Sequence, residues 1–545
     1  CGYMEARFET MEKTTELCIH NANIIDGTGK PAFRGSVGLS RGRIAFVRAG
    51  QGVPPARELL DAKGLTLCPG FIDAHSHGDL MLESDFSSLS KLSQGITTQV
   101  AGQCGASMCP GNTERLDEFT RFVSGIAPHP TLPKTPAAIS GFDAYARYIE
   151  GLDLPLNLAL FTGHGALRLW AMGYDDSAPT ASQQERMEGM LRECIQAGSL
   201  GLSTGLVYTP GCYGGEEEIT GLLKAARAED GIYATHVRDE SDGLIEAEQE
   251  AVRSAEKADI PLFISHFKAA GRQNWGKPGR ILKEVFDPAI ARGLRLTVDH
   301  YPYLAGMTSL NVSIPPRFRK DGLEMLARHL SDPAALKEMR MEMAEPNGYD
   351  NYIYNSGGFG GVLVSSCPLF REAEGMTIAA YAEKTDQDPF DAYADILRRN
   401  QGLGLGVYFH MCEDDLLTIA QYPHSVIGTD ALLGRPDENG HPRAFGSFVR
   451  AVEYYVFEKK LFSIEEMIRR MSGLPADRLG LYGKGLIAAG MDADLVLLDL
   501  ANLRARADYA DSNRTCLGVE TVFVAGEAAY AKGALTGSRR GTLLR

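Results

Sequence analysis

The sequence predicts an α/β fold, and three observations support this prediction. Short apolar runs alternate with longer helix-like segments through the middle of the chain. The runs are mainly apolar and do not alternate with polar residues, which is typical of parallel strands that are buried on both faces. Both ends of the chain are instead rich in short β-type segments broken by Gly, Asp and Asn, which indicate hairpins.

Eight apolar runs are found, and this number indicates a (β/α)8 TIM-like barrel. Each run is short and is followed by a segment long enough for a helix. The runs are GFIDAH (70–75), GITTQVAG (95–102), LNLALFTGHG (156–165), LGLSTGL (200–206), GIYATHV (231–237), IPLFISHF (260–267), LRLTVDHYPY (294–303) and HSVIGTD (424–430).

The two β-rich ends leave two arrangements open. Residues 15–47 and the C-terminal stretches GLIAAGMDADLVLLDL and ETVFVAGEAAYAKGAL have the same texture of short strands and turns. They predict either two terminal domains or one small sheet built from both ends of the chain.

A long connection, residues 304–423, separates the seventh run from the eighth. Its stretch GYDNYIYNSGGFGGV has no clear helical period, so we expect an inserted subdomain or lid there. After the eighth run, Ser463 is followed three residues later by Glu466, which predicts the start of an amphipathic helix.

Composition limits the partners and the location of the protein. The 545 residues carry a formal net charge of −15, which argues against a cationic groove for nucleic acid. No run of apolar residues is long enough for a membrane span. The ten cysteines contain no C-x-x-C pair, so we expect reduced thiols and a cytoplasmic protein. A lipid anchor on Cys1 is the minor alternative, and the oligomeric state is left open.

Side chains that can bind a metal stand at the ends of six of the eight runs. The carboxyl ends of barrel strands meet at one rim, so these side chains should converge. Imidazole and thiolate are good zinc ligands, and two histidines at i and i+2 point the same way from a strand. A single histidine is more often structural, but this set is harder to dismiss. The set is His75 and His77, Cys104, His164, His236, His266 and Asp430.

Several stretches together resemble the D-aminoacylases, the N-acyl-D-amino-acid deacylases of the amidohydrolase superfamily. The resemblance runs from about residue 15 to the C-terminus and keeps the order of the motifs. The motifs are PGFIDAHSH, GITTQVAGQCG, GHGALR, GLSTGLVYTPG, YATHVRDE, ISHFKAAGRQNWGK, DHYPY and IGTDALLGRPDENGHPRAFGSF.

The resemblance implies a domain organisation. Family members have a distorted (β/α)8 barrel, a small β-sandwich made from both chain ends, and an insertion before the last barrel strand. We therefore expect residues 15–66 and 484–545 to form the sandwich and residues 67–483 the barrel. The region 304–423 should contain the insertion.

The resemblance also implies a zinc enzyme that hydrolyses N-acyl-D-amino acids to a carboxylate and a free D-amino acid. In this family a cysteine binds zinc where many relatives use a carboxylated lysine on the fourth strand, and LGLSTGL has no lysine. Asp430 is expected to be the general base and acid that serves a zinc-activated water. By motif position, Cys104, His236 and His266 should form a tight zinc site, and His75, His77 and Asp430 a second, weaker one.

Substrate-binding residues follow from the same motifs. Arg443 matches the family's carboxylate anchor, and the planar fork of arginine suits that role. Lys268 matches a substrate-contacting lysine. One of Tyr301 and Tyr303 should assist it, and alternation places both on one face. His164 is expected in the substrate pocket or in a structural role. Structural roles are expected for His129, His300, His410, His441, Cys109, Cys212, Cys367 and Cys412.

Two positions depart from the family pattern. Phe267 stands where a second histidine is common, and Met307 stands among residues that tend to be small and hydroxylated. Both are expected near the pocket, so the preferred side chain and acyl group are left open. The enzymatic alternatives are a hydrolase of D-residue dipeptides or of cyclic amides, and the missing lysine argues against a hydantoinase type. The non-enzymatic alternative is an inactive scaffold, and the complete set of metal-binding residues argues against it.

Overall fold

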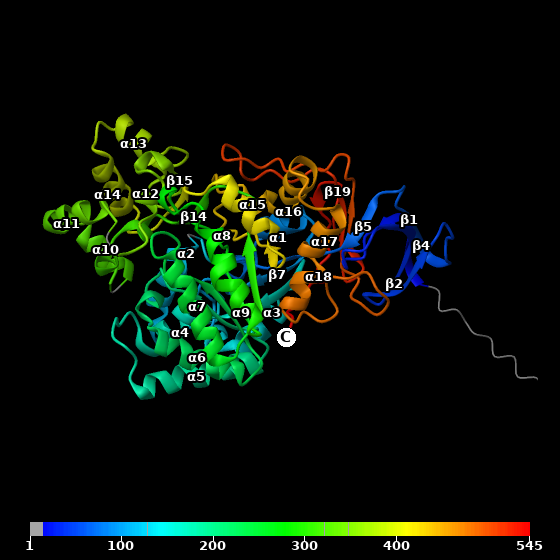
Figure 1. The fold of residues 1–545 in the computed structure, drawn as a ribbon, viewed down its shortest axis with the longest axis horizontal. Coiled ribbons are helices and arrows are strands. Elements are labelled where there is room, and N and C mark those ends of the chain that lie inside the picture. The colour runs from blue at the N-terminus through cyan, green and yellow to red at the C-terminus, as the bar shows by residue number, and fades with distance from the viewer. Residues whose placement is uncertain (1–14, 128, 321, 347) are drawn as a thin grey trace, which may run out of the picture.

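A barrel of parallel strands lies at the centre of the computed structural model, which describes residues 15–127, 129–320, 322–346 and 348–545 (Figure 1). Cys1, the residue of the lipid-anchor alternative, lies outside the described residues. The barrel strands are β6 (Phe71–Asp73), β7 (Ile96–Ala101), β8 (Asn157–Leu160) with its continuation β9 (Thr162–Gly163), β10 (Gly201–Gly205), β11 (Ile232–His236), β12 (Leu262–Ile264), β13 (Leu296–His300) and β17 (Ser425–Ile427).

The barrel closes through two arcs of hydrogen-bonded strands. One arc has the order β6-β7-β8, and the other has the order β9-β10-β11-β12-β13-β17. Phe161 alone separates β8 from β9, and a parallel bridge between Ser76 and Ala431 joins the two outer strands. Each of the eight predicted runs supplies one position of the barrel. The predicted (β/α)8 class is therefore confirmed.

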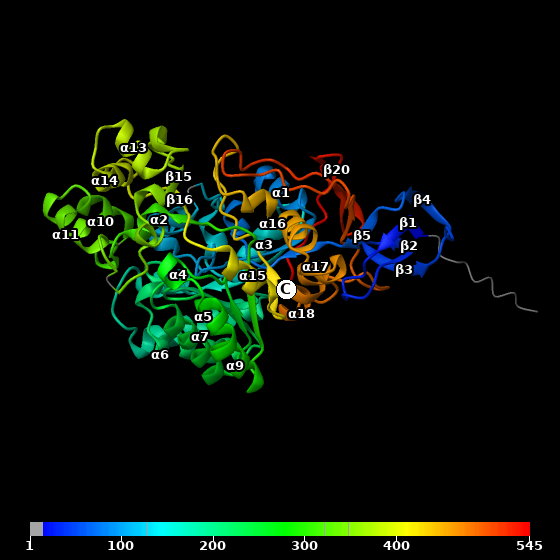
Figure 2. The same cartoon turned by 45° about the horizontal axis from the view of Figure 1, so that its top comes forward.

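Helices cover the outside of the barrel and separate its strands in sequence (Figure 2). Ser463 begins one of them as predicted, because its side chain accepts a hydrogen bond of 3.2 Å from the Glu466 amide. The helices are α1 (Asp85–Leu92), α2 (Leu116–Ile126), α3 (Phe142–Glu150), α4 (His164–Met172), α5 (Ala181–Gln196), α6 (Glu216–Arg227), α7 (Leu244–Ala258), α8 (Lys277–Ile281), α9 (Asp287–Ala291), α15 (Glu413–Gln421), α16 (Arg443–Ala451), α17 (Ile464–Met471) and α18 (Gly473–Arg478).

The two ends of the chain form one sheet, as the family resemblance implies, and this decides between the two arrangements that the residue pattern alone left open. β18 of the C-terminal part pairs antiparallel with β5 of the N-terminal part. Ile19 and Val37 from one end pack with Leu497 and Phe523 from the other in a single apolar cluster. The strands are β1 (Thr15–Ile24), β2 (Phe33–Ser40), β3 (Arg43–Ala49), β4 (Ala56–Asp61), β5 (Thr66–Pro69), β18 (Leu495–Leu498), β19 (Val519–Val524), β20 (Glu527–Ala531) and β21 (Ala534–Leu535).

The long connection forms a separate lobe at the end of the molecule opposite β1–β4 (Figures 1 and 2). It has its own apolar cluster and a three-stranded antiparallel sheet of order β14-β16-β15. We call this lobe the insertion; its domain limits, like those of the terminal sheet, stay predictions. Its elements are β14 (Gly306–Ser309), α10 (Gly322–His329), α11 (Pro333–Met343), α12 (Tyr352–Asn355), β15 (Val362–Ser366), α13 (Ile378–Lys384), α14 (Pro389–Arg399) and β16 (Leu405–Tyr408).

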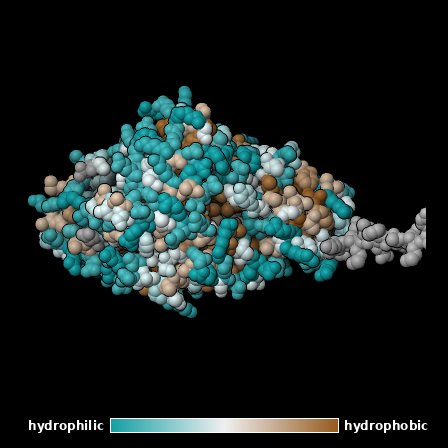
Figure 3. All heavy atoms as spheres, turned by 90° about the horizontal axis from the view of Figure 1, so that it is seen from below, coloured by the Kyte–Doolittle hydropathy of each residue, from teal (hydrophilic) through white to brown (hydrophobic). Residues whose placement is uncertain are grey.

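On the face drawn in Figure 3, hydrophobic residues lie in small groups among hydrophilic ones. No helix in the described ranges is long and apolar enough to cross a membrane.

Candidate metal centre

The loop after β7 brings a buried cysteine to the carboxyl end of the barrel. Cys104 has a positive φ of 53°, and Gly102 and Gly105 on either side have φ values of 72° and 73°. A Cβ on Gly102 would lie 2.2 Å from the Phe161 carbonyl oxygen, so the loop packs too closely for a side chain there. The glycines therefore allow the turn that points Cys104 into the barrel.

Three predicted site residues share an uncommon backbone conformation. Like Cys104, His266 and Asp430 are non-glycine residues with positive φ, at 36° and 47°. All three stand directly after or near the end of a barrel strand. Left-handed backbone at non-glycine residues is uncommon and concentrates at functional sites, where surrounding structure holds it in place. This feature marks the rim of the barrel as a functional region.

Four predicted ligands meet in one buried cluster. Cys104 Sγ lies 3.4 Å from His75 Nε2 and 3.3 Å from His266 Nε2. Asp430 Oδ1 lies 3.7 Å from His75 Nε2 and 3.3 Å from His77 Nε2. One ligand atom from each of His75, Cys104, His266 and Asp430 lies within 4.8 Å of all the others.

A second group shares His266 with the first. His236 and His266 lie with their ring centroids 4.5 Å apart, and Glu240 Oε1 is 3.0 Å from His266 Nδ1. His236, Glu240 and His266 also meet the spacing of a metal site. The structure thus groups Cys104 with His75, whereas the sequence analysis groups it with His236. His266 belongs to both groups. The assignment of one tight and one weak site therefore stays a prediction.

The first group fits zinc by its chemistry. Thiolate, imidazole and carboxylate are the donors that zinc takes, and four such side chains converge here in a buried cluster. Burial raises the pKa of the Cys104 thiol well above its usual range, and the charges of Asp430 and Glu240 raise it further. A thiolate at this position therefore requires a cation beside it, which metal binding supplies.

Asp299 orients two of the candidate ligands from behind. Its carboxylate lies 3.2 Å from His75 Nδ1 and accepts a hydrogen bond of 2.9 Å from the His266 amide. A carboxylate on the far nitrogen of a ligand histidine fixes the ring and leaves the other nitrogen free for the metal. Burial raises the pKa of Asp299 to about 7. The sequence analysis did not select Asp299.

Arg443, Lys268 and Tyr301 line the same cavity as the cluster, and their role in substrate binding stays a prediction. Arg443 Nη1 lies 2.7 Å from Asp430 Oδ2, while its Nε has no hydrogen-bond partner among the described residues. The Tyr301 hydroxyl is also buried without a described partner. Burial alone would raise the pKa of Asp430, but the charges of Arg443 and His266 hold it well below its usual range.

Two of the predicted substrate-binding residues, Tyr303 and His164, lie outside this cavity. The Tyr303 hydroxyl donates to the Pro442 carbonyl at 3.3 Å, so Tyr301 is the tyrosine that faces the cluster. β13 ends at His300, and the alternation that would place both tyrosines on one side ends with it. His164 is buried and lies 2.7 Å from Glu218, so its contacts favour the structural alternative.

The two residues that depart from the family pattern, Met307 and Phe267, lie in different places. Met307 lines the cavity, as expected. Phe267 does not line it and packs instead on Phe286 in the apolar core, with ring centroids 5.3 Å apart. The expectation that Phe267 affects the pocket is therefore corrected: its side chain faces the surrounding helices.

Four residues of the cavity were missed or were given structural roles by sequence analysis. Glu240 ion-pairs with Lys268, and the Tyr352 hydroxyl donates to Glu240 at 3.2 Å. Both ring nitrogens of His410 are buried without a described partner. Tyr208 packs edge-on against His236 at 5.1 Å. Glu240 belongs to the motif YATHVRDE, so the motif was a sequence signal that pointed to it. Tyr352 comes from the insertion, and His410 lies just after its last strand.

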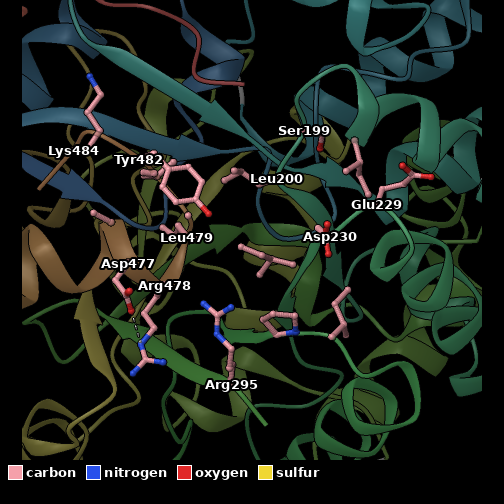
Figure 4. Close-up of a pocket in the computed structure, with 18 of the residues that line it drawn as sticks. Ser199, Leu200, Glu229, Asp230, Arg295, Asp477, Arg478, Leu479, Tyr482 and Lys484 are labelled. Atoms are coloured by element: carbon pink, nitrogen blue, oxygen red, sulfur yellow. Dashed lines mark ion pairs between the residues drawn. The ribbon is translucent and has the colours of Figure 1, made fainter. Parts of the chain in front are cut away.

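A larger cavity, of about 910 Å³, lies at the other end of the barrel (Figure 4). Its lining includes Leu200, Asp230 and Arg295, which come just before strands rather than after them. Neither metal-binding group of the described residues includes any residue of this cavity. In barrels of this kind, chemistry is found at the carboxyl ends of the strands. The smaller cavity with the cluster is therefore the candidate site.

Comparisons with known proteins find a D-aminoacylase and a related deacylase among the similar proteins. The model of the Amidohydrolase family matches residues 58–348 and 402–530. A D-aminoacylase of Alcaligenes xylosoxydans xylosoxydans is 30% identical over 97% of both chains. An N-acyl-D-glutamate deacylase of the same organism is 31% identical over 98% of this chain and 97% of its own.

Solved structures of the same kinds of enzyme are also similar to this chain. An N-acyl-D-glutamate deacylase from Bordetella bronchiseptica, in complex with zinc and a phosphonate mimic of the tetrahedral intermediate, has a TM-score of 0.82. It is 30% identical, and the alignment covers 98% of this chain and all of the other. A second similar structure is a D-aminoacylase with a binuclear metal centre, which one metal activates and a second attenuates. Its TM-score is 0.80 and its identity is 27%, and the alignment covers 97% of this chain and all of the other.

Proposed function

The chain belongs to the amidohydrolase family, and we propose that it is a zinc-dependent deacylase of N-acyl-D-amino acids. It would cleave the amide bond to give a carboxylate and a free D-amino acid. The observation that carries this proposal is the placement of the cysteine–histidine–aspartate cluster and two cations at one buried cavity. Full-length similarity to three curated deacylases of N-acyl-D-amino acids supports it.

His75, Cys104 and His266 with Asp430 would hold zinc, and His236 and His77 stand beside them. When bound, zinc polarises the amide carbonyl and lowers the pKa of a water molecule beside it. We propose one tightly bound ion and a second, weaker position. The unpaired state of the nine described cysteines supports a reducing, cytoplasmic location.

Asp430 moves the proton in this proposal. Its low pKa keeps the carboxylate ionised, so Oδ1 or Oδ2 can accept the proton of the water that attacks the amide carbon. The tetrahedral intermediate then breaks its C–N bond, and Asp430 gives the same proton to the leaving nitrogen. The base and the acid are one residue, so the proton is returned within each turnover.

Arg443 and Lys268 would bind the α-carboxylate of the substrate. Lys268 Nζ is held by Glu240 and lies 2.8 Å from His266 Nδ1, close to the cluster. Arg443 donates to the Met307 carbonyl at 2.9 Å, which fixes its guanidinium while Nε remains available. Two cations on one side of the reacting amide would fix the position of the α-carbon and thus favour one configuration.

The proposal is tested by release of free amino acid from N-acetyl-D- and N-acetyl-L-amino acids, with and without added zinc. We expect release from the D series alone, and a chelator should abolish it. Release from D-residue dipeptides or cyclic amides with none from the D series would replace this function by another amidohydrolase activity. A zinc-loaded protein that releases nothing from any of these compounds would favour the inactive scaffold.

Replacement of Arg443 by Ala should mainly weaken substrate binding. Loss of a buried, charge-assisted contact to a carboxylate corresponds to a rise in KM of about 30- to 100-fold, with a smaller change in kcat. Steady-state kinetics with the best N-acetyl-D-amino acid measure both constants. Arg450→Ala is a matched control, because Arg450 is on the same helix, α16, and does not line the cavity. An unchanged KM for Arg443→Ala would contradict the carboxylate role.

A further inference from the structure

A buried histidine in the wall of the metal cavity makes no hydrogen bond from its side chain. His410 follows β16, lines the cavity and is 2% exposed. Neither Nδ1 nor Nε2 has a hydrogen-bond partner among the described residues. Buried polar groups are nearly always paired in folded proteins, because an unpaired one costs free energy. The imidazole of His410 is therefore a candidate for binding a group that enters the cavity.

The ring of His410 is held in place by its neighbours. It packs near the rings of Tyr352 and Tyr408, with ring centroids 5.7 Å and 6.4 Å away. The backbone carbonyl of His410 accepts hydrogen bonds from the Gly271 amide at 2.8 Å and from Trp275 Nε1 at 3.1 Å. A side chain that is fixed before binding loses little conformational entropy when it takes a ligand.

Two unpaired polar atoms face the same position of the cavity wall, beside Gly306. A Cβ on Gly306 would lie 3.1 Å from His410 Nε2 and 3.5 Å from the Tyr301 hydroxyl oxygen. Gly306 and Tyr301 both line the cavity, and the Tyr301 hydroxyl is also buried without a described partner. Because Gly306 has no side chain, a ligand atom can approach both groups at this position.

The charges around this position favour an anionic ligand. Lys268 and Arg443 both line the cavity and both act electrostatically on His410. Arg443 also lies over the Tyr301 ring, with its guanidinium carbon 4.7 Å from the ring centroid. The nearby Glu240 is paired with Lys268. Burial lowers the pKa of His410 to about 3 and the charge of Lys268 lowers it further, so the ring is neutral and can carry its one N–H on Nε2.

The free donors match the needs of a carboxylate, whose two oxygens accept about four hydrogen bonds. Arg443 Nε and the Tyr301 hydroxyl supply one donor each. The ammonium group of Lys268 uses two of its N–H groups on neighbouring side chains and keeps the third. His410 Nε2 supplies the fourth donor, so without His410 one lone pair of a bound carboxylate has no partner among these groups.

We propose that His410 is a substrate-binding residue whose Nε2 donates to the α-carboxylate of the N-acyl-D-amino acid, beside Arg443, Lys268 and Tyr301. This proposal rests on the proposed deacylase function and adds a fourth donor to its substrate site. His410 lies directly after the last strand of the insertion, so this part of the chain completes the carboxylate site. Every substrate of this class has the same α-carboxylate, and the contact therefore serves all of them regardless of side chain.

The first experiment compares His410→Phe, which keeps the ring but loses both nitrogens, with His410→Gln, which keeps an N–H near the position of Nε2. Both zinc-loaded, full-length variants are assayed with N-acetyl-D-amino acids that have apolar and polar side chains. Compounds that turn over slowly are measured as competitive inhibitors. A hydrogen bond to a charged group corresponds to about 10- to 100-fold in binding, so His410→Phe should raise every KM or Ki by about this factor. We expect kcat of His410→Phe, and KM of His410→Gln, to stay within about threefold of the wild type.

His329→Phe is the matched control for His410→Phe. His329 belongs to α10 of the insertion, packs edge-on against Phe318 and does not line the cavity. Its replacement should leave KM, kcat and zinc content unchanged.

The second experiment fills the position beside Gly306, and it tests the site even if His410→Phe does not fold. Gly306→Ala places a methyl group next to His410 Nε2 and the Tyr301 hydroxyl. The methyl group keeps a carboxylate away from both donors, so we expect KM to rise at least about tenfold. Gly360→Ala is the control, because Gly360 is also in the insertion, has nothing within 4 Å of a Cβ and does not line the cavity.

The outcomes separate this proposal from the function on which it rests. An unchanged KM in His410→Phe overturns the proposal, as does an unchanged KM in Gly306→Ala. A rise confined to substrates with polar side chains also overturns it, because His410 would then bind the side chain. Equal losses of kcat in His410→Phe and His410→Gln, without a rise in KM, would assign His410 a structural role instead. Failure of the wild type to hydrolyse any N-acyl-D-amino acid overturns the proposed function itself.

Discussion

Replacement of Cys104 by Ala is expected to remove the tightly bound zinc and the activity together. Cys104 is the only thiol in either metal-binding group of the described residues, and its Sγ lies within 3.4 Å of two histidine nitrogens. Without this anionic donor, the remaining histidines bind zinc weakly. We expect zinc content after dialysis to fall from about one ion to near zero and kcat/KM to fall by at least about three orders of magnitude.

Cys109→Ala is the matched control for this variant. Cys109 is a second buried cysteine that follows β7, but it packs in an apolar cluster and not against the ligands. The Cys109→Ala variant should keep its zinc and its activity. The thermal midpoint gives an independent measurement, because zinc that binds only the folded state raises it. Added zinc should raise the midpoint of the wild type and of Cys109→Ala, but not of Cys104→Ala. Full zinc content and activity in Cys104→Ala would refute the ligand assignment.

Asp430→Asn should abolish turnover and leave substrate binding largely intact. The amide keeps the shape of the side chain but accepts no proton from water at neutral pH, so both proton transfers are lost. General acid–base catalysis contributes about 10²- to 10⁴-fold, and a fall of about a thousandfold in kcat is expected. Single-turnover measurements with saturating enzyme separate this chemical step from binding.

Asp437→Asn is the control for Asp430→Asn. Asp437 is seven residues further along, on the exposed surface, where it pairs with Arg371. Its replacement should leave kcat unchanged. Zinc should remain bound in Asp430→Asn, because Cys104, His75 and His266 are still present. If Asp430→Asn retains wild-type kcat, another group must carry the proton, and Glu240 is then the first residue to test.

The local sequence was sufficient for the barrel. All eight predicted runs became barrel strands, because a strand buried on both faces is mainly apolar. The ends of the strands carried the ligand candidates for the same reason, since only there can polar side chains reach the rim. The glycines around Cys104 also had a local cause, in a turn with positive φ on both sides.

Residues that depend on contacts between distant segments were harder to predict. Asp299 stands beside the ligands because strands from different parts of the chain meet, and nothing in its own neighbourhood distinguishes it from other buried acids. Tyr352 reaches His236 at 3.5 Å from a part of the insertion that has no clear period in the sequence. His410 was given a structural role and lies in the cavity instead.

The sequence by itself determined the barrel, the type of metal ligands and the family, because periodicity, donor chemistry and motif order are local properties. Only the tertiary structure decided that Tyr301 rather than Tyr303 faces the cluster, and that Phe267 turns into the core while Met307 lines the cavity. The physical reason is that side-chain direction alternates predictably only within a strand. Beyond its end, packing against distant segments sets the direction of each side chain.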